Sequence, residues 1–195
     1  FIFSFIARIA KEKRYILLAI IWTGLVAAVL ICFAGFRSGS VGDTGMYMHS
    51  YRMYVSDPST IPYDRDWGFS LLNLLLIQFS SNPQTLVFVT SFINQLCNMI
   101  VFYKYSSYLE LQVFVYIASG YLTTSMNGMR QCLAASILFL FTKLITDGKF
   151  IAYLIIVLII STIHGSALIM IPVYFIVRQK AWSRNVVIFI IIAVI

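Results

Sequence analysis

The chain has 195 residues, of which 61% are hydrophobic and 11% are charged, and its formal net charge at pH 7 is +7. The mean hydropathy of +0.90 excludes an ordinary soluble domain and predicts an all-α fold, a polytopic transmembrane helical protein. The basic residues stand in short clusters beside apolar runs, as in cytoplasmic loops, so we expect the lipid bilayer and not nucleic acid as their partner.

We expect residues 1–195 to form a single integral membrane domain that is an excerpt of a longer protein, truncated at both ends. Phe1–Ala10 and Val186–Ile195 are apolar runs at the two ends of the chain. Each is about half of the ~20 residues that one helical span needs.

The first complete span is predicted at Tyr15–Phe36, which contains no charged residue. The segment before it, residues 8–14, is net basic, which places it in the cytoplasm by the positive-inside rule. The loop Phe36–Trp67 therefore lies outside, and its net acidic charge agrees with this orientation.

The outer loop is expected to carry a short amphipathic helix. Asp43 and Thr44 are plausible N-caps for a helix that ends near residues 57–58. Three aromatic residues would share one face with Asp43 at helical spacing: Tyr47, Tyr51 and Tyr54. They can stack on sugar rings or form the aromatic belt that is usual at a bilayer surface.

Further apolar runs predict five more helices: Phe69–Phe79, Leu86–Tyr103, Leu111–Ser125, Met129–Ile145 and Phe150–Val177, the last interrupted at residues 161–166. Phe69–Phe79 is too short to span comfortably, so it is either a short tilted span or a re-entrant helix. If it crosses, the Asn127–Arg130 turn faces inward and Phe150–Val177 is one long span. If it is re-entrant, that turn and His164 lie outside with the Phe36–Trp67 loop. We prefer the second arrangement because it gathers the costly polar groups into one site.

Arg130 stands at the mouth of an apolar helix. A central arginine costs roughly 2.5–3.5 kcal/mol on insertion scales and is normally functional or paired. Asn127 and Gln131 lie at positions that let all three side chains point into one cavity. The alternatives are an arginine that reaches the interface or one that pairs with an aspartate for structure.

Arg37 and His164 are the other polar groups that need an explanation. Arg37 precedes Ser38, Gly39 and Ser40, small residues that let a backbone approach a ligand, and a guanidinium binds phosphate through paired hydrogen bonds. An ordinary interfacial anchor is the equal alternative. His164 breaks an apolar helix and is either a proton-handling imidazole or a packing residue.

Metal and disulfide chemistry are not expected. Asp64-Arg65-Asp66 spells a D-x-D that can hold a divalent cation, but three-residue matches are common by chance and a solvated loop is the preferred interpretation. The cysteines are isolated within apolar segments, without metal-ligand spacing: Cys32, Cys97 and Cys132.

Four segments together resemble the EpsG branch of the Wzy-type polysaccharide polymerases. They are Phe36–Gly39 with Gly42–Thr44 and Tyr47, Trp67–Asn73, Met129–Ser136, and Ile163–Ile169. One departure is that the family usually has glutamate directly before the glycine at Gly68. Here Trp67 takes that place, and Asp66 lies one position earlier.

The resemblance implies an enzyme at the outer face of the bacterial cytoplasmic membrane. It would transfer a growing glycan from a polyprenyl diphosphate carrier to the next lipid-linked repeat unit, in a glycosyltransferase-C-like arrangement of helices and without a cofactor. Arg37 and Arg130 would stabilise the diphosphate leaving group, Asp43 or His164 would take the acceptor's proton, and grooves between helices would hold the lipid tails. The candidate catalytic residues are Asp43, Arg130 and His164, and the candidate substrate-binding residues are Arg37, Tyr47, Tyr51, Asp66, Asn73, Asn127, Gln131 and Ser166.

Partners and rival functions follow from the same features. The polyprenyl-diphosphate-linked oligosaccharide is the expected substrate, and a chain-length regulator and a flippase of the same pathway are expected partners. The chief alternative is a lipid-linked sugar flippase or transporter, because broken helices and polar groups at membrane depth also describe transporters. An O-antigen-ligase-like enzyme or an acyltransferase that uses His164 is the third hypothesis.

Overall fold

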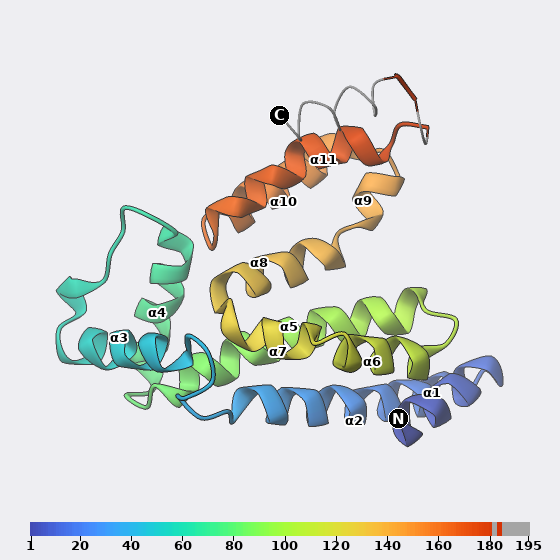
Figure 1. Cartoon of the computed structure of the whole chain (residues 1–195), viewed down its shortest axis with the longest axis horizontal. Helices are drawn as coiled ribbons and strands as arrows, with labels where there is room; N and C mark the ends of the chain where they lie inside the picture. The colour runs from blue at the N-terminus through green and yellow to red at the C-terminus, as the bar shows by residue number, and fades with distance from the viewer. Residues whose placement is uncertain (181–182, 185–195) are drawn as a thin grey trace.

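The computed structural model describes residues 1–180 and 183–184, so the predicted apolar run Val186–Ile195 lies outside the described residues. Within the described part every regular element is a helix, which confirms the all-α prediction. The arrangement of these helices is shown in Figure 1.

The first group of helices packs around α2 and α5, which lie against each other along their length. The two helices run in opposite directions: Gln84 at the start of α5 donates to the carbonyl of Gly35 at the end of α2 (2.6 Å), and Lys11 before α2 donates to the carbonyl of Tyr103 near the end of α5. The group comprises α1 (Ile2–Glu12), α2 (Ile16–Gly35), α5 (Gln84–Tyr105), α6 (Leu109–Ala118) and α7 (Tyr121–Asn127).

A second group follows α7 and has its own apolar core. Tyr153 and Tyr174 stack within it with ring centroids 5.6 Å apart, and Arg178 returns to donate to the carbonyl of Ile145 (2.6 Å). The last segment therefore folds back along α10 (Figure 1). The group comprises α8 (Met129–Leu140), α9 (Lys143–Thr146), α10 (Phe150–Ser161), the 3₁₀ helix η2 (Gly165–Ile169) and α11 (Met170–Val177).

The segment between α2 and α5 stays at one end of the molecule (Figure 1). It contains α3 (Thr44–Ser56), the 3₁₀ helix η1 (Pro58–Thr60) and α4 (Trp67–Phe79). The start of α4 is fixed by Gly68, whose amide donates to the carbonyl of Thr162 (2.8 Å), and its end by Ser80, whose carbonyl accepts from the Tyr51 hydroxyl (2.8 Å).

The structure brings together the segments that the second predicted arrangement places side by side. The turn at Asn127–Arg130 and the α10–η2 junction at His164 lie at the same end as α3 and α4, and we call this the site end. The turns after α1, α5, α8 and α11 lie at the opposite end, which we call the basic end because it carries Arg8–Arg14, Lys104, Lys143, Lys149 and Arg178.

Two predicted helices are wrong in extent. Leu111–Ser125 is divided into α6 and α7, because Gly120 adopts a positive φ of 78° that a right-handed helix cannot contain. Met129–Ile145 ends as α8 at Leu140, and the short α9 follows a break. Within the described part, α2 and α5 are long and apolar enough to cross a membrane, whereas the other apolar helices are shorter.

Candidate active site

Asp66 is the centre of a polar cluster at the site end. Its Oδ2 lies 2.9 Å from Nη1 of Arg130 and 3.4 Å from Nδ1 of His164, and its Oδ1 accepts a hydrogen bond from the amide of Gly165 (3.0 Å). Three segments distant in the sequence therefore meet on one carboxylate. We call Asp66, Arg130 and His164 the Asp66 cluster.

The backbone around Asp66 explains how the carboxylate reaches its partners. Asp66 stands at the N-cap of α4 in the left-handed conformation (φ 50°), which aspartate tolerates better than most residues. Two positions on, Gly68 packs so closely on Thr162 that a Cβ at Gly68 would collide with that side chain. The close approach of α4 to the α10–η2 junction therefore depends on glycine at this place.

Arg130 lies in the first turn of α8 and is held from several sides. Its Nε donates to the hydroxyl of Tyr47 (3.2 Å), and its guanidinium carbon lies 5.8 Å from the ring centroids of both Tyr47 and Phe69. The side chain is 36% exposed, and Nη2 makes no hydrogen bond to any residue that the structure describes. The Nη2 amino group thus remains available to a ligand.

His164 occupies the extended residue between α10 and η2 (φ −155°, ψ 119°). Its Nδ1 faces Asp66, and Nε2 has no hydrogen bond within the described part of the chain. A histidine whose Nδ1 is held by a carboxylate presents Nε2 as the proton acceptor. The pair can therefore act as an oriented general base.

Arg37 is only 7% exposed and has a different environment. Nε donates to Thr44 Oγ1 (2.8 Å), and Nη1 donates to the carbonyl of Ala34 (2.6 Å) and to Ser91 Oγ (2.8 Å). Burial lowers the pKa of Arg37 to about 10, so the guanidinium remains charged at neutral pH. The arginine ties the end of α2 to α3 and α5.

Asn127 and Asp43 connect the α7–α8 turn to the segment before α3 through a contact of the Asp43 backbone. The amide of Asp43 donates to Oδ1 of Asn127 (3.0 Å), while the exposed Asp43 carboxylate makes no hydrogen bond in the described part. Asp43 occupies the N-cap position of α3 as predicted, but its side chain does not cap the helix.

Tyr51 and Asn73, both predicted to bind substrate, lie in the interior. Tyr51 is fully buried and donates to Ser80. Asn73 is buried in α4, where its Nδ2 donates to the carbonyl of Phe69 (2.8 Å). Neither side chain presents a surface to a sugar in this structure, so their contacts are those of packing residues.

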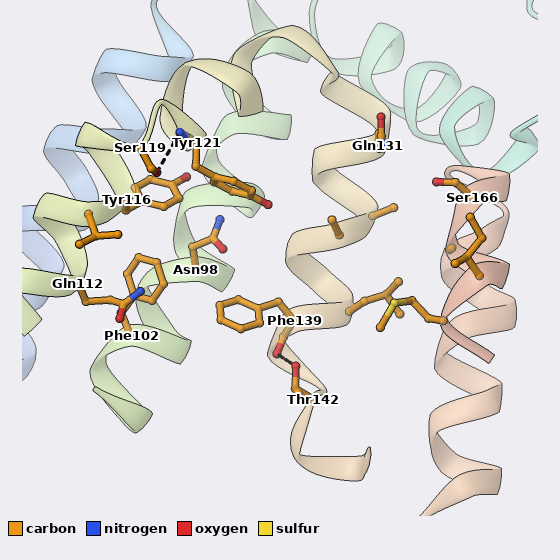
Figure 2. A pocket seen from close by; sticks show the side chains of 17 residues that line it. Asn98, Phe102, Gln112, Tyr116, Ser119, Tyr121, Gln131, Phe139, Thr142 and Ser166 are labelled. Atoms are coloured by element: carbon orange, nitrogen blue, oxygen red, sulfur yellow. Dashed lines mark hydrogen bonds between the residues drawn. The ribbon is translucent and has the colours of Figure 1, made fainter. Parts of the chain in front are cut away.

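Gln131 and Ser166 line a pocket of about 740 Å³ on α8 (Figure 2). Gln131 directly follows Arg130, and Ser166 directly follows Gly165, which binds Asp66. Both side chains lie at the end of the pocket nearest the Asp66 cluster, and Phe139 and Thr142 lie at the other end (Figure 2). We call this cavity the α8 pocket.

The two aspartates of the D-x-D motif have different environments. Asp64 is exposed and its Oδ1 accepts from the amide of Arg65 (2.9 Å), whereas Asp66 belongs to the cluster. Among the described residues, no group of three or more His, Cys, Asp or Glu side chains is placed to hold a metal ion.

Some contributors to the site were missed from the sequence. The amide of Gly165 and the ring of Phe69 contact the Asp66 cluster, but neither residue type signals such a role. A buried polar row on α5 was also missed: Asn94, Gln95 and Asn98. Amide side chains repeated within an apolar helix are costly unless paired, so their spacing was a usable signal.

Comparison with known proteins gives one family. The model of the EpsG family matches residues 20–195, which is nearly the whole chain. No curated protein and no solved structure gives a significant match.

Proposed function

Because the chain belongs to the EpsG family, a family of Wzy-like polysaccharide polymerases, we propose that it joins lipid-linked oligosaccharide repeat units into an exopolysaccharide. The donor in this proposal is a glycan on a polyprenyl diphosphate, and the acceptor is the next lipid-linked repeat unit. The reaction takes place at the outer face of the bacterial cytoplasmic membrane.

The arrangement of the two ends supports this placement. Cationic residues of several turns gather at the basic end, which the positive-inside rule assigns to the cytoplasm. The site end is then outside, and α4, both ends of which lie there, does not cross the membrane. The short helices α6 and α7 together pass between the two ends, whereas α8 does so alone and α9 lies at the basic end.

The Asp66 cluster is the observation that carries the proposal. Glycosyl transfer forms a bond between the acceptor oxygen and the anomeric carbon as the bond from that carbon to the diphosphate oxygen breaks. The acceptor hydroxyl loses a proton, which passes to Nε2 of His164, and Asp66 stabilises the resulting imidazolium through Nδ1. The carboxylate also fixes the orientation of the ring.

The leaving group is a polyprenyl diphosphate, on which negative charge grows as the glycosidic bond breaks. Arg130 presents Nη2 beside the base, and a guanidinium stabilises developing phosphate charge without a metal ion. Tyr47 accepts a hydrogen bond from Nε and Asp66 one from Nη1, so the cation is positioned before the substrate arrives. Arg37 is not assigned to this step, because its hydrogen bonds go to the protein.

The experiment is reconstitution of the full-length protein with lipid-linked repeat units, read as product length on a gel. A polymerase alone is expected to yield a ladder of repeat units, and a chelator should not abolish it. A protein that moves the same lipid across vesicles without lengthening the glycan would be a flippase, and transfer only to a protein, lipid or acyl acceptor would identify a ligase or acyltransferase. Either result would overturn the proposal.

A further inference from the structure

The α8 pocket has an unequal distribution of polar groups along its length. Gln131 and Ser166 at the site end make no hydrogen bond to any described residue. Deeper in the pocket, the Tyr116 hydroxyl donates to Gln95 Oε1 (2.9 Å) and Asn98 Nδ2 donates to the carbonyl of Asn94 (2.9 Å). Beside Phe102, the Gln112 side chain makes no hydrogen bond to a described residue, and most other side chains of the wall are apolar. A ligand meets unpaired polar groups at the site end and mainly hydrocarbon beyond it.

The floor of the pocket is one face of α8. Successive turns of the helix contribute Gln131, Ala135 and Phe139, which lie at intervals of four residues and so share a face. Small side chains near the Asp66 cluster leave room for a bulky chain, while Phe102 and Phe139 pack edge to face at the far end (centroids 6.3 Å apart). The pocket is therefore mostly apolar.

The polar end of the pocket adjoins the Asp66 cluster, because its two polar residues are sequence neighbours of residues that form or contact the cluster. Gln131 is adjacent to Arg130, and Ser166 is adjacent to Gly165, whose amide binds Asp66. An amphiphile with an anionic head at Arg130 would have its tail directed along α8. A free sugar would leave the apolar wall in contact with water, so it fits the pocket poorly.

We propose that the α8 pocket holds the isoprenoid tail of the lipid-linked donor, with Gln131 and Ser166 beside its first phosphate. This inference rests on the proposed function for the identity of the lipid. It assigns the tail to the face of α8 that continues from Arg130, so that the tail positions the diphosphate and the anomeric carbon before His164. Tail binding thereby contributes to the orientation of the reacting atoms.

Ala135 allows the pocket to be narrowed without touching the Asp66 cluster. Ala135→Phe places a ring in the middle of the pocket, and Ala152→Phe makes the same change on the exposed surface of α10, outside the pocket. The kcat/KM ratio between a long-tailed and a short-tailed donor is measured for each protein. Because apolar burial is lost, Ala135→Phe should reduce this ratio at least about tenfold, while Ala152→Phe leaves it unchanged.

A photoreactive polyprenyl diphosphate gives a readout that needs no turnover. We expect it to label peptides of α8 or η2 in the full-length protein, and an unlabelled polyprenyl diphosphate should prevent labelling better than phosphatidylglycerol does. Labelling elsewhere, equal competition by phosphatidylglycerol, or an unchanged tail-length ratio in Ala135→Phe would overturn the inference. A wild-type protein that is labelled in α8 but makes no ladder would overturn the polymerase proposal and leave the tail site intact.

Discussion

Two arginines at the site end lie in opposite environments. Arg37 is 7% exposed, and its hydrogen bonds go to three neutral oxygen atoms of the protein. Arg130 has a side chain that is 36% exposed, an aspartate partner and a free Nη2 within the described part. The sequence presented both as phosphate ligands, and only their surroundings separate them.

The difference in burial and pairing indicates which of the two arginines can bind a substrate. A buried guanidinium whose donors are used by the protein stabilises the packing of the segments that it joins, because losing it leaves buried oxygens unpaired. A guanidinium that is partly exposed beside a carboxylate and an imidazole can rearrange its contacts when a diphosphate arrives. Substitutions at the two sites should therefore affect different properties, stability at Arg37 and transfer at Arg130.

The largest expected effect is at His164. His164→Ala should slow glycan transfer by roughly 10²–10⁴, the usual contribution of a positioned general base, without reducing donor binding. Asp66→Asn keeps the shape of the side chain but removes the charge that orients the imidazole, so a loss in kcat is expected there too. The measurement is single-turnover transfer with the donor saturating. Near-normal rates in His164→Ala would return this residue to a packing role.

The next largest effect is at Arg130. Arg130→Lys keeps the charge but loses the planar fork, so it should be nearly as inactive as Arg130→Ala in a protein that stays folded. Both should weaken binding of a polyprenyl diphosphate by about 1.5–3 kcal/mol, the contribution of a hydrogen bond to a charged group. Binding is measured by titration of the detergent-solubilised protein.

A double substitution separates this role from a structural ion pair. If Arg130 only balances Asp66, Arg130→Ala should lower the melting temperature, and Arg130→Ala with Asp66→Asn should restore much of it. Full activity in a stable Arg130→Lys protein would contradict the phosphate role directly.

At Arg37 the expected loss is in stability. Arg37→Lys cannot reach Thr44, Ser91 and the Ala34 carbonyl together, and each lost hydrogen bond to the charged group should lower stability by about 1.5–3 kcal/mol. The readout is the melting temperature and membrane abundance, with diphosphate affinity measured on the fraction that remains folded. A stable Arg37→Lys protein with weakened diphosphate binding would show that Arg37 contacts the substrate.

Much of the architecture follows from hydropathy and charge. Apolar runs predicted where helices lie, and the cost of polar groups at membrane depth favoured the arrangement that brings Asn127–Arg130 and His164 beside the outer loop. The division of α6 from α7 at Gly120 was not foreseen, because an isolated glycine inside an apolar run is also tolerated in a continuous helix.

The three residues of the Asp66 cluster were each named as candidates from the sequence, but their pairing was not predicted. Asp66 was named as a candidate for substrate binding but not as the centre of the site, because it lies one place away from the family's usual carboxylate. Its left-handed conformation nevertheless directs the side chain to Arg130 and Gly165. Tyr51 shares a helix and a spacing with Tyr47, and only packing shows that the first is buried and the second lies against Arg130. Side-chain direction at such positions depends on neighbours far away in the sequence.

The smallest expected effect is at Asp43, which lies between the two arginines. The next residue, Thr44, accepts a hydrogen bond from Arg37, and the amide of Asp43 donates to Asn127, three positions before Arg130. Because that contact uses the backbone, Asp43→Asn should leave it intact and change the transfer rate little. Asn127→Ala removes the acceptor and should lower stability by about 0.5–1.5 kcal/mol, the net worth of one hydrogen bond. Thermal unfolding and single-turnover transfer measure the two variants. A rate loss in Asp43→Asn as large as that of His164→Ala would instead make Asp43 the base, because only a group that takes the proton itself could show that loss with its backbone contact preserved.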